Sequence, residues 1–196
     1  RVLLNLAAFH ALRITEEDRE RNAMYAAEQK RTTIAAEITS VGEYLERLGI
    51  KLSITCNDIA MIPRLAQLTQ KTNQFNLTTH RSTEQEIGEW MENGGLVFAG
   101  TVKDKFGPYG ITVLSVVLPL SETEVELKIM LMSCRVMGRQ VEQAFVSAVC
   151  GELVKRGFTT IKATFISTKK NPPAAEFLPS IGAKEVSRDE GKIFYE

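Results

Sequence analysis

Cysteine and histidine are scarce in this chain of 196 residues. Its three cysteines, Cys56, Cys134 and Cys150, are odd in number and far apart, and His10 and His80 do not stand at metal-ligand spacing from them. Disulfide frameworks need paired cysteines, and zinc sites need closely spaced Cys or His ligands. We therefore expect neither a disulfide scaffold nor a metal site, and we expect a reducing, cytoplasmic compartment.

The chain also lacks an excess of charge of either sign. Its 24 Lys and Arg residues balance 24 Asp and Glu residues, so no net basic field attracts nucleic acid or an anionic membrane. The longest apolar run, GITVLSVVLPL at 110–120, is interrupted by Pro119 and is shorter than the ~20 residues of a membrane helix. We therefore expect partners other than nucleic acid and membranes.

The first third of the sequence has the pattern of helices, with Thr15 and Ser40 as caps of the first two. The predicted helices cover 15–31, 40–49 and 58–75, and one predicted strand covers 50–55. Residues 1–76 are therefore predicted to form a helical subdomain.

From residue 77 onward the pattern changes to strands that alternate with helices. The predicted strands cover 77–80, 95–102, 110–118, 125–133, 159–167 and 192–196, and the predicted helices cover 83–93, 138–156 and 171–182. Thr83 and Glu86 form a capping box at the first of these helices. This order predicts an α/β (α+β) domain, residues 77–196, with a mixed sheet and helices on both of its faces.

The order of elements resembles the fold of the GNAT acyltransferases, in which a pyrophosphate-binding loop opens the long helix after the fourth strand. Loops of that family read (R/Q)-x-x-G-x-(G/A), and Arg135, Gly138 and Gln140 match the first two fixed positions and depart at the last. Free backbone amides at a helix N-terminus favour an anion. We therefore expect the backbone from Val136 to Gln140, with the side chains of Arg135 and Arg139, to bind a phosphate or a pantetheine arm.

Three stretches are more specific: QLTQKTNQFNLTT at 67–79, DKFGPYG at 104–110 and MSCRVMGRQVE at 132–142. Together with ITEEDRERNAMY and KKNPPAAEFLPSIGA, they resemble the C-terminal half of FkbH-like proteins along essentially the whole chain. In that family a phosphatase-like domain of the haloacid dehalogenase superfamily precedes a GNAT-like domain. The D-x-D-x-(T/V) motif of the phosphatase-like domain is missing here, so we expect that domain upstream in a longer protein.

The resemblance also implies a reaction. FkbH-like proteins take a glyceryl group from bisphosphoglycerate and load it onto an acyl carrier protein, as an entry to methoxymalonyl-type units for polyketide biosynthesis. The implied donor is a phosphorylated three-carbon acyl compound, and the implied partner is an acyl carrier protein. We expect no cofactor bound in the domain itself, with the phosphopantetheine of the carrier protein or CoA as the acyl carrier.

Cys134 is the candidate nucleophile. A lone cysteine is usually a small buried hydrophobe, but Cys134 stands at a predicted strand end, before a helix, flanked by Arg135 and Arg139. Cations and a helix dipole favour the thiolate, and a thiolate forms a thioester without a strong separate base. The two arginines can instead be surface ion pairs, and strand alternation is expected to point Ser133 to the opposite face.

A polar segment supplies most of the candidate substrate-binding residues. The full set is Asn73, Gln74, Asn76, Thr78, Arg81 and Asn171. Amide groups can donate hydrogen bonds to an acyl oxygen or to hydroxyl groups. A polar helix end on the surface would explain the same composition without a function.

Two other functions stay open. GNAT N-acetyltransferases often place a tyrosine general acid a turn or two after the position of Asn171, and Leu178 stands where that tyrosine would fall. An acyl-CoA-dependent N-acyltransferase is the first alternative, which the missing acid disfavours. A non-catalytic module that docks a carrier protein is the second.

Overall fold

The computed structural model describes residues 16–38 and 40–196, with side chains from residue 25 onward. The described residues form two compact units, the first from residues 16–38, 40–49 and 104–107 and the second from residues 50–103 and 108–196. The boundary predicted at residue 76 therefore falls at residue 49. The reason is that the strand β1 (Lys51–Cys56) pairs with the large sheet rather than with the helices before it.

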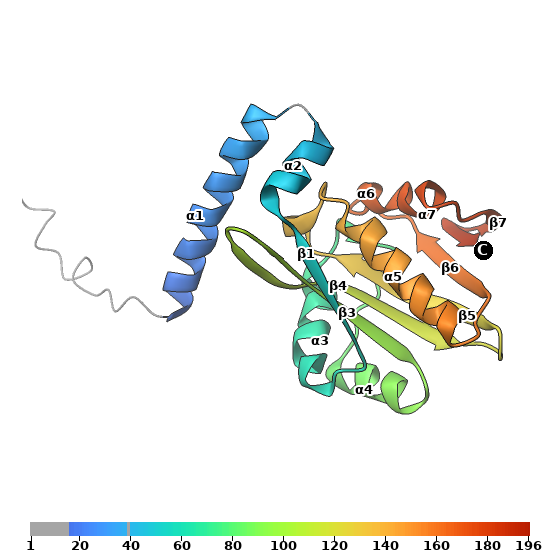
Figure 1. Ribbon diagram of the computed structural model, residues 1–196. Helices are drawn as coiled ribbons and strands as arrows, with labels where there is room; N and C mark the ends of the chain where they lie inside the picture. Colours follow the sequence, from blue (N-terminus) through green and yellow to red (C-terminus); the bar gives the residue numbers. More distant parts are fainter. Residues whose placement is uncertain (1–15, 39) are drawn as a thin grey trace, which may run out of the picture. The chain divides into compact units, whose positions relative to one another are not determined.

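The first unit contains the helices α1 (Glu16–Glu37) and α2 (Val41–Leu48) (Figure 1). α1 continues past residue 31, where its end was predicted, and the hydroxyls of Thr32 and Thr33 there donate hydrogen bonds to carbonyls of the preceding turn. Thr15, its predicted cap, lies outside the described residues. Ser40 stands at the start of α2 without a side-chain capping bond, and Gly49 ends the helix at a φ of +63°, as predicted.

A buried ion pair joins residues 104–107 to this unit. Arg31 on α1 donates from Nε to Asp104 Oδ2 over 2.7 Å and from Nη2 to Asp104 Oδ1 over 2.9 Å. Asp104 Oδ1 also accepts from the backbone amide of Phe106. The carboxylate thereby fixes both the helix side chain and the turn of the hairpin.

The second unit is built on an eight-stranded mixed sheet with the order β1-β3-β4-β5-β6-β8-β7, and β2 pairs with β5 off this path. The remaining strands are β2 (Phe75–Asn76), β3 (Leu96–Asp104), β4 (Gly107–Pro119), β5 (Glu124–Met132), β6 (Thr160–Ile166), β7 (Glu185–Asp189) and β8 (Lys192–Tyr195). β5 and β6 run parallel, whereas β4 with β5 and β6 with β8 run antiparallel. The mixed sheet predicted from the sequence is confirmed.

Helices cover both faces of this sheet (Figure 1). They are α3 (Ile62–Lys71), α4 (Glu84–Glu92), α5 (Val141–Lys155), α6 (Pro172–Ala175) and α7 (Phe177–Ser180), with 3-10 turns η3 (Ile59–Met61) and η4 (Cys134–Val136). Asp58 caps η3 by accepting from the amide of Ala60, and Thr83 caps α4 by accepting from the amide of Glu86. Both caps agree with the sequence pattern.

Two apolar clusters hold the layers together. On one face, Leu65 of α3 and Ile87 of α4 pack with inward side chains of β3, β4 and β5. On the other, Phe145 of α5 and Phe177 of α7 pack with the opposite side chains of the same strands. Gly100 on β3 allows this second contact, because a Cβ there would lie 3.1 Å from the ring of Phe145.

Two strand predictions were wrong. The strand predicted at 77–80 lies at 75–76, and β7 was not predicted at all. All five side chains of β7 are exposed, so the strand has none of the alternation by which a half-buried strand is detected.

Candidate functional site

The candidate nucleophile lies in a tight turn at the end of a central strand. β5 ends at Met132, and Ser133 caps η4 by accepting hydrogen bonds at Oγ from the backbone N and the Nε of Arg135. The amide of Ser133 donates to the carbonyl of Thr112 over 2.8 Å, which holds the turn against β4. The prediction that strand alternation orients Ser133 therefore does not apply, because Ser133 caps a turn instead of continuing the strand.

The three thiols differ in exposure. Cys134 is exposed, whereas Cys56 and Cys150 are partly buried. Burial raises the pKa of Cys56, with a smaller opposing effect from Arg156, and burial also raises the pKa of Cys150. Solvent access and thiolate formation thus disfavour chemistry at Cys56 and Cys150.

The loop after Cys134 is only partly available to a ligand. The amide of Val136 donates to the carbonyl of Ser133, and the amide of Met137 donates to the carbonyl of Cys134. These two amides are therefore used inside the turn, contrary to the prediction that the backbone from Val136 to Gln140 is open. Val136 itself is buried in the core.

Gly138 and Gln140 hold the loop in left-handed backbone conformations, with φ of +73° and +55°. Among the described residues, their amides have no hydrogen-bond acceptor. α5 begins at Val141 rather than at Gly138, and Gln140 is its N-cap residue. The helix whose N-terminus was predicted to bind an anion is present, but it begins at Val141 instead of Gly138.

Arg135 and Arg139 have different surroundings. Arg139 donates from Nη1 to the carbonyl oxygen of Arg135, and its guanidinium lies 5.3 Å from the centre of the Tyr109 ring. Arg135 is partly buried, and burial together with the charge of Arg64 lowers the pKa of Arg135. The sequence places Arg139 close to Arg135, whereas the effect of the Arg64 charge on Arg135 arises only in the folded chain.

Asn76 and Asn171 lie together in the interior, and both are fully buried. Asn76 Nδ2 donates to the carbonyl of Thr72, and its Oδ1 accepts from the amide of Thr79. Asn171 Oδ1 accepts from the amide and hydroxyl of Thr168, and its Nδ2 donates to the carbonyls of Asn76 and Ile166. The polar atoms of both amides are thus engaged within the chain, which is a structural role rather than the substrate contact proposed from the sequence.

Other predicted substrate residues also make internal contacts. Arg81 donates to the carbonyls of Thr69 and Thr72 at the end of α3, and to Asn73 Oδ1. Its charge therefore complements the carboxyl end of that helix. Thr78 donates to the carbonyl of Lys128 over 3.3 Å. Gln74 is the member of the set whose side chain is exposed.

A short segment fills the space where two central strands separate. The parallel pairing of β5 with β6 ends at Leu127 and Ala163, although both strands continue. Beyond that point β2 pairs with β5, the amide of Leu77 donates to the carbonyl of Met130, and the amide of Ile166 donates to the carbonyl of Leu77. The chain itself therefore satisfies the backbone groups that the separation of the strands would expose.

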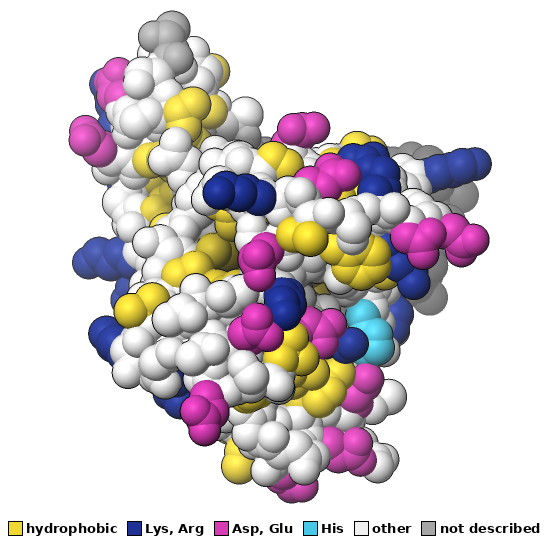
Figure 2. Space-filling model, turned by 90° about the vertical axis from the view of Figure 1, so that its right-hand side faces the viewer, with side chains coloured by type: hydrophobic (Ala, Val, Ile, Leu, Met, Phe, Trp, Pro, Cys, Tyr) yellow, Lys and Arg dark blue, Asp and Glu magenta, His cyan; other side chains and the backbone are white. Residues whose placement is uncertain are grey.

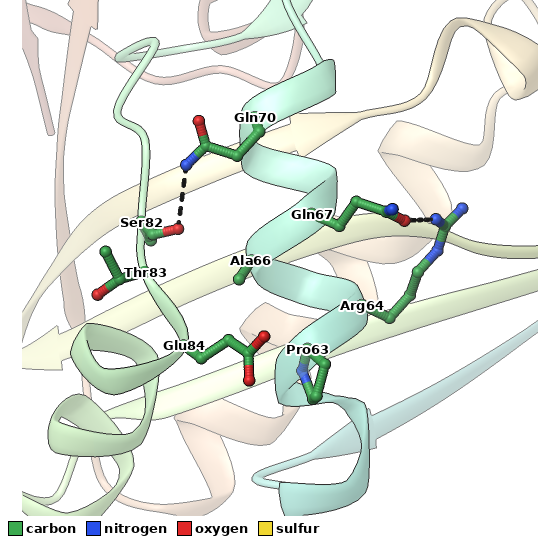
Figure 3. A pocket seen from close by; sticks show the side chains of 8 residues that line it. All are labelled: Pro63, Arg64, Ala66, Gln67, Gln70, Ser82, Thr83 and Glu84. Carbon is green, nitrogen blue, oxygen red and sulfur yellow. Dashed lines mark hydrogen bonds between the residues drawn. The ribbon is translucent and has the colours of Figure 1, made fainter.

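An open groove of about 640 Å³ lies between α3 and the start of α4 (Figure 3). Its lining residues are Pro63, Arg64, Ala66, Gln67, Gln70, Ser82, Thr83 and Glu84. The two walls are tied together by Gln70 Nε2, which donates to the carbonyl of Ser82 over 3.3 Å. The sequence does not reveal this groove, because only the fold brings the two walls together.

Among the residues that the structure describes, no group of three or more His, Cys, Asp or Glu side chains is placed to hold a metal ion. No described helix is both long and apolar enough to cross a membrane. On the face drawn in Figure 2, basic and acidic side chains are interspersed among uncharged ones.

Comparison by sequence identifies no relatives: no family model matches the chain, and no curated protein matches it. Comparison by structure finds acetyltransferases. The ribosomal-protein-S18-alanine N-acetyltransferase of Escherichia coli has a TM-score of 0.57 at 14% identity, over 74% of this chain and 92% of its own. Ard1 of Thermoplasma volcanium has a TM-score of 0.56 at 16% identity, over 74% of this chain and 94% of its own.

A third structure is a GNAT family acetyltransferase of Elizabethkingia anophelis with acetyl-CoA bound. It has a TM-score of 0.53 at 11% identity, over 74% of this chain and 95% of its own. Identities this low establish the architecture and leave the activity to be argued from the site. The chain has the GNAT fold.

Proposed function

We propose that this chain is an acyltransferase domain in which the Cys134 thiol receives an acyl group and passes it to a second thiol. One observation carries the proposal: Cys134 is the exposed thiol among three, and it lies in the turn between β5 and α5 of a GNAT fold. The nearby Arg135 and the unoccupied amides of Gly138 and Gln140, among the described residues, favour negative charge at this turn.

The reaction consists of two acyl transfers. The Cys134 thiolate attacks the carbonyl carbon of the donor, a carbon–sulfur bond forms, and the donor's phosphate or thiolate leaves with the bonding electron pair. The thiolate of the acceptor then attacks the thioester carbonyl, and the Cys134 thiolate is released. No oxidant or reductant is needed, and no strong general acid is required to protonate the leaving group.

The resemblance to FkbH-like proteins specifies the substrates of the proposal. The acyl group would be a glyceryl or similar three-carbon hydroxyacyl group from a phosphorylated donor. The acceptor would be the phosphopantetheine thiol of an acyl carrier protein, in the biosynthesis of a polyketide extender or starter unit. A phosphatase-like domain upstream would complete the protein.

A second candidate is an acyl-CoA-dependent N-acyltransferase. Two of the structural neighbours favour it, because they are described as acetyltransferases and one of them has acetyl-CoA bound. Leu178 weighs against it, since it stands at the sequence position where GNAT N-acetyltransferases often have a tyrosine acid, and its side chain is 2% exposed in the apolar core. A docking module without catalysis is the third candidate.

Intact-protein mass after incubation with an acyl donor separates the three. The cysteine mechanism predicts an acyl adduct on the wild-type protein and on Cys150→Ala, and none on Cys134→Ala. Acylation of an amine from acyl-CoA without any adduct would support the N-acyltransferase instead. Carrier-protein binding with neither adduct nor turnover would support the docking module.

A further inference from the structure

β7 forms one edge of the sheet in the second unit. Within the described part of the chain it pairs with β8 and stands last in the strand order, at the margin of the sheet (Figure 1). All five of its side chains are exposed, and that of Val186 is 65% exposed. The outer side of an edge strand presents backbone N–H and C=O groups that can pair with a further strand.

The hydrogen bonds beside β7 show which of its backbone groups face outward. Lys184 and Glu196 exchange both of their backbone hydrogen bonds, over 2.8 and 2.9 Å. Hydrogen-bonded and non-hydrogen-bonded pairs alternate along antiparallel strands, so the next pair, Glu185 with Tyr195, is of the second kind. The N–H and C=O groups of Glu185 therefore point away from β8.

A bulge determines where the next outward-facing residue stands. The register shifts between Glu185 and Ser187, so Val186 is an extra residue on β7. The alternation continues along β8, which has no extra residue, and Arg188 opposite Ile193 again belongs to a non-hydrogen-bonded pair. The outward-facing groups thus belong to Glu185 and Arg188, which are separated by two residues instead of one.

The charges around this bulge are self-complementary. The sequence at 184–189 is KEVSRD, with charges in the order plus, minus, neutral, neutral, plus, minus. If a second copy runs antiparallel to the first, Lys184 faces Asp189 of the second copy, and Glu185 faces Arg188. The same alignment brings the outward backbone groups of Glu185 opposite those of Arg188. Side chains and backbone therefore favour one and the same register.

Other registers are disfavoured by like charges. A slip of one position in one direction brings Glu185 opposite Asp189, and a slip in the other direction brings Lys184 opposite Arg188. Like charges directly opposite each other destabilise a strand pair. Charged side chains usually protect an edge strand from association. Here their order prevents the wrong alignments and permits a single one.

The ion pair within one copy prepares the contact with the second. Arg188 donates from Nε and Nη2 to the two carboxylate oxygens of Glu185, over 3.1 and 2.9 Å. Both side chains lie on the same face of the sheet, because Tyr195 and Ile193 opposite them are two positions apart on β8. A second copy would place another guanidinium beside this carboxylate and another carboxylate beside this guanidinium. Such a network stabilises more than an isolated surface pair does.

We propose that this chain forms a symmetric dimer in which β7 pairs antiparallel with β7 of a second copy. The two-fold axis passes through the centre of the facing Val186–Ser187 segments, so the interface is isologous. At each contact between Glu185 and Arg188, the two residues exchange both backbone hydrogen bonds, which joins the two sheets into one. Pairing also covers Val186. The dimer does not depend on the proposed function, because no residue of the Cys134 turn takes part.

Analytical ultracentrifugation of the whole chain at increasing concentration measures the association. Pairing of one short edge strand buries less area than a standard interface, so we expect a reversible dimer with a Kd of about 10–100 μM. Glu185→Arg and Arg188→Glu each place like charges opposite one another at both ends of the contact. Each variant should therefore weaken dimerisation by about tenfold or more.

Mixing these two variants tests the register directly. The Glu185→Arg strand is positive at both positions, and the Arg188→Glu strand is negative at both, so every contact in a heterodimer joins opposite charges. An equimolar mixture should therefore associate about as tightly as the wild type. Glu43→Arg is the matched control, because Glu43 makes an exposed ion pair of the same kind with Arg47, over 2.9 Å on α2. This variant should dimerise like the wild type.

Hydrogen exchange followed by NMR locates the interface. The amides of Glu185 and Arg188 should exchange more slowly as the concentration rises and the dimer forms. The proposal is overturned if the wild type stays monomeric across the concentration range, or if a dimer forms without slower exchange at these amides. It is also overturned if the mixture of variants associates no better than either variant alone. Protection of the two amides only on addition of a different protein would show another occupant of this edge and refute the dimer.

Discussion

Asn171 Nδ2 donates a hydrogen bond to the backbone carbonyl of Asn76 over 2.9 Å, and the two residues are 95 positions apart in the sequence. The same amide nitrogen reaches the carbonyl of Ile166 at the end of β6. Asn171 therefore connects β6, the loop after it and the segment that lies between β5 and β6. One buried side chain holds three parts of the chain at the point where the central strands separate.

Replacing Asn171 by alanine should destabilise the fold. The variant leaves the carbonyls of Asn76 and Ile166 and the amide of Thr168 without their buried partner. Each unsatisfied group costs about 1–3 kcal/mol, but the loop can relax, so we expect a loss of about 3 kcal/mol in the free energy of unfolding. Urea denaturation monitored by circular dichroism measures it.

Gln74→Ala is the control for this change, since Gln74 is exposed and should alter stability by less than about 0.5 kcal/mol. A fully stable Asn171→Ala protein that no longer binds substrate would reverse the assignment. It would return Asn171 to the substrate-contacting role that the sequence analysis gave it.

The segment between β5 and β6 should be rigid. The amide of Leu77 donates to the carbonyl of Met130 over 3.0 Å, and the amide of Ile166 donates to the carbonyl of Leu77 over 2.8 Å. Hydrogen exchange followed by NMR should show both amides protected to the same degree as the β4–β5 ladder, because opening either bond separates the sheet. Rapid exchange at Leu77, comparable with that at exposed Gln74, would show that the segment leaves this position freely.

Two glycine-to-alanine substitutions are expected to change the stability of the fold in opposite directions. A Cβ on Gly95 would lie 2.6 Å from the carbonyl oxygen of Trp90 and 2.9 Å from Leu118, so Gly95→Ala should cost roughly 2 kcal/mol or more. Gly151 lies exposed within α5 with open space around it, and Gly151→Ala should gain about 0.5–1 kcal/mol from helix propensity. Thermal unfolding of the two variants beside the wild type should move the midpoint in opposite directions.

Local chemistry explains which parts of the fold could be predicted. Thr83 with Glu86, Gly49 after α2 and the turn before Gly107 each act within a few residues, so their effect is readable from the sequence. The position of β2 could not be predicted in the same way. Phe75 and Asn76 form a strand because a gap beside β5 accepts them, and their own pattern does not require it.

In the candidate site, too, residues that are close in the sequence could be predicted, whereas residues that only the fold brings together could not. The Cys134 turn was found because a cysteine, a glycine and two arginines are close in the sequence. Arg64 carried no such signal, because it is far from Arg135 in the sequence and only the fold lets its charge lower the pKa of Arg135. Asn76 and Asn171 were identified as polar residues of interest, but only the fold shows that they bond to the chain itself.

The thiols should react with iodoacetamide in an order set by exposure and pKa. Alkylation proceeds through the thiolate, and burial raises the pKa of Cys56 and of Cys150 above the ordinary thiol value of 9.0. A raised pKa keeps these two thiols protonated at pH 7–8, and their alkylation should become appreciable only as the pH rises through the raised pKa. Exposed Cys134 should therefore be modified first at pH 7, as peptide mapping by mass spectrometry can establish at pH 7, 8 and 9. Modification of Cys56 or Cys150 before Cys134 would remove the observation on which the cysteine mechanism depends, and direct transfer between bound substrates would then be the better account.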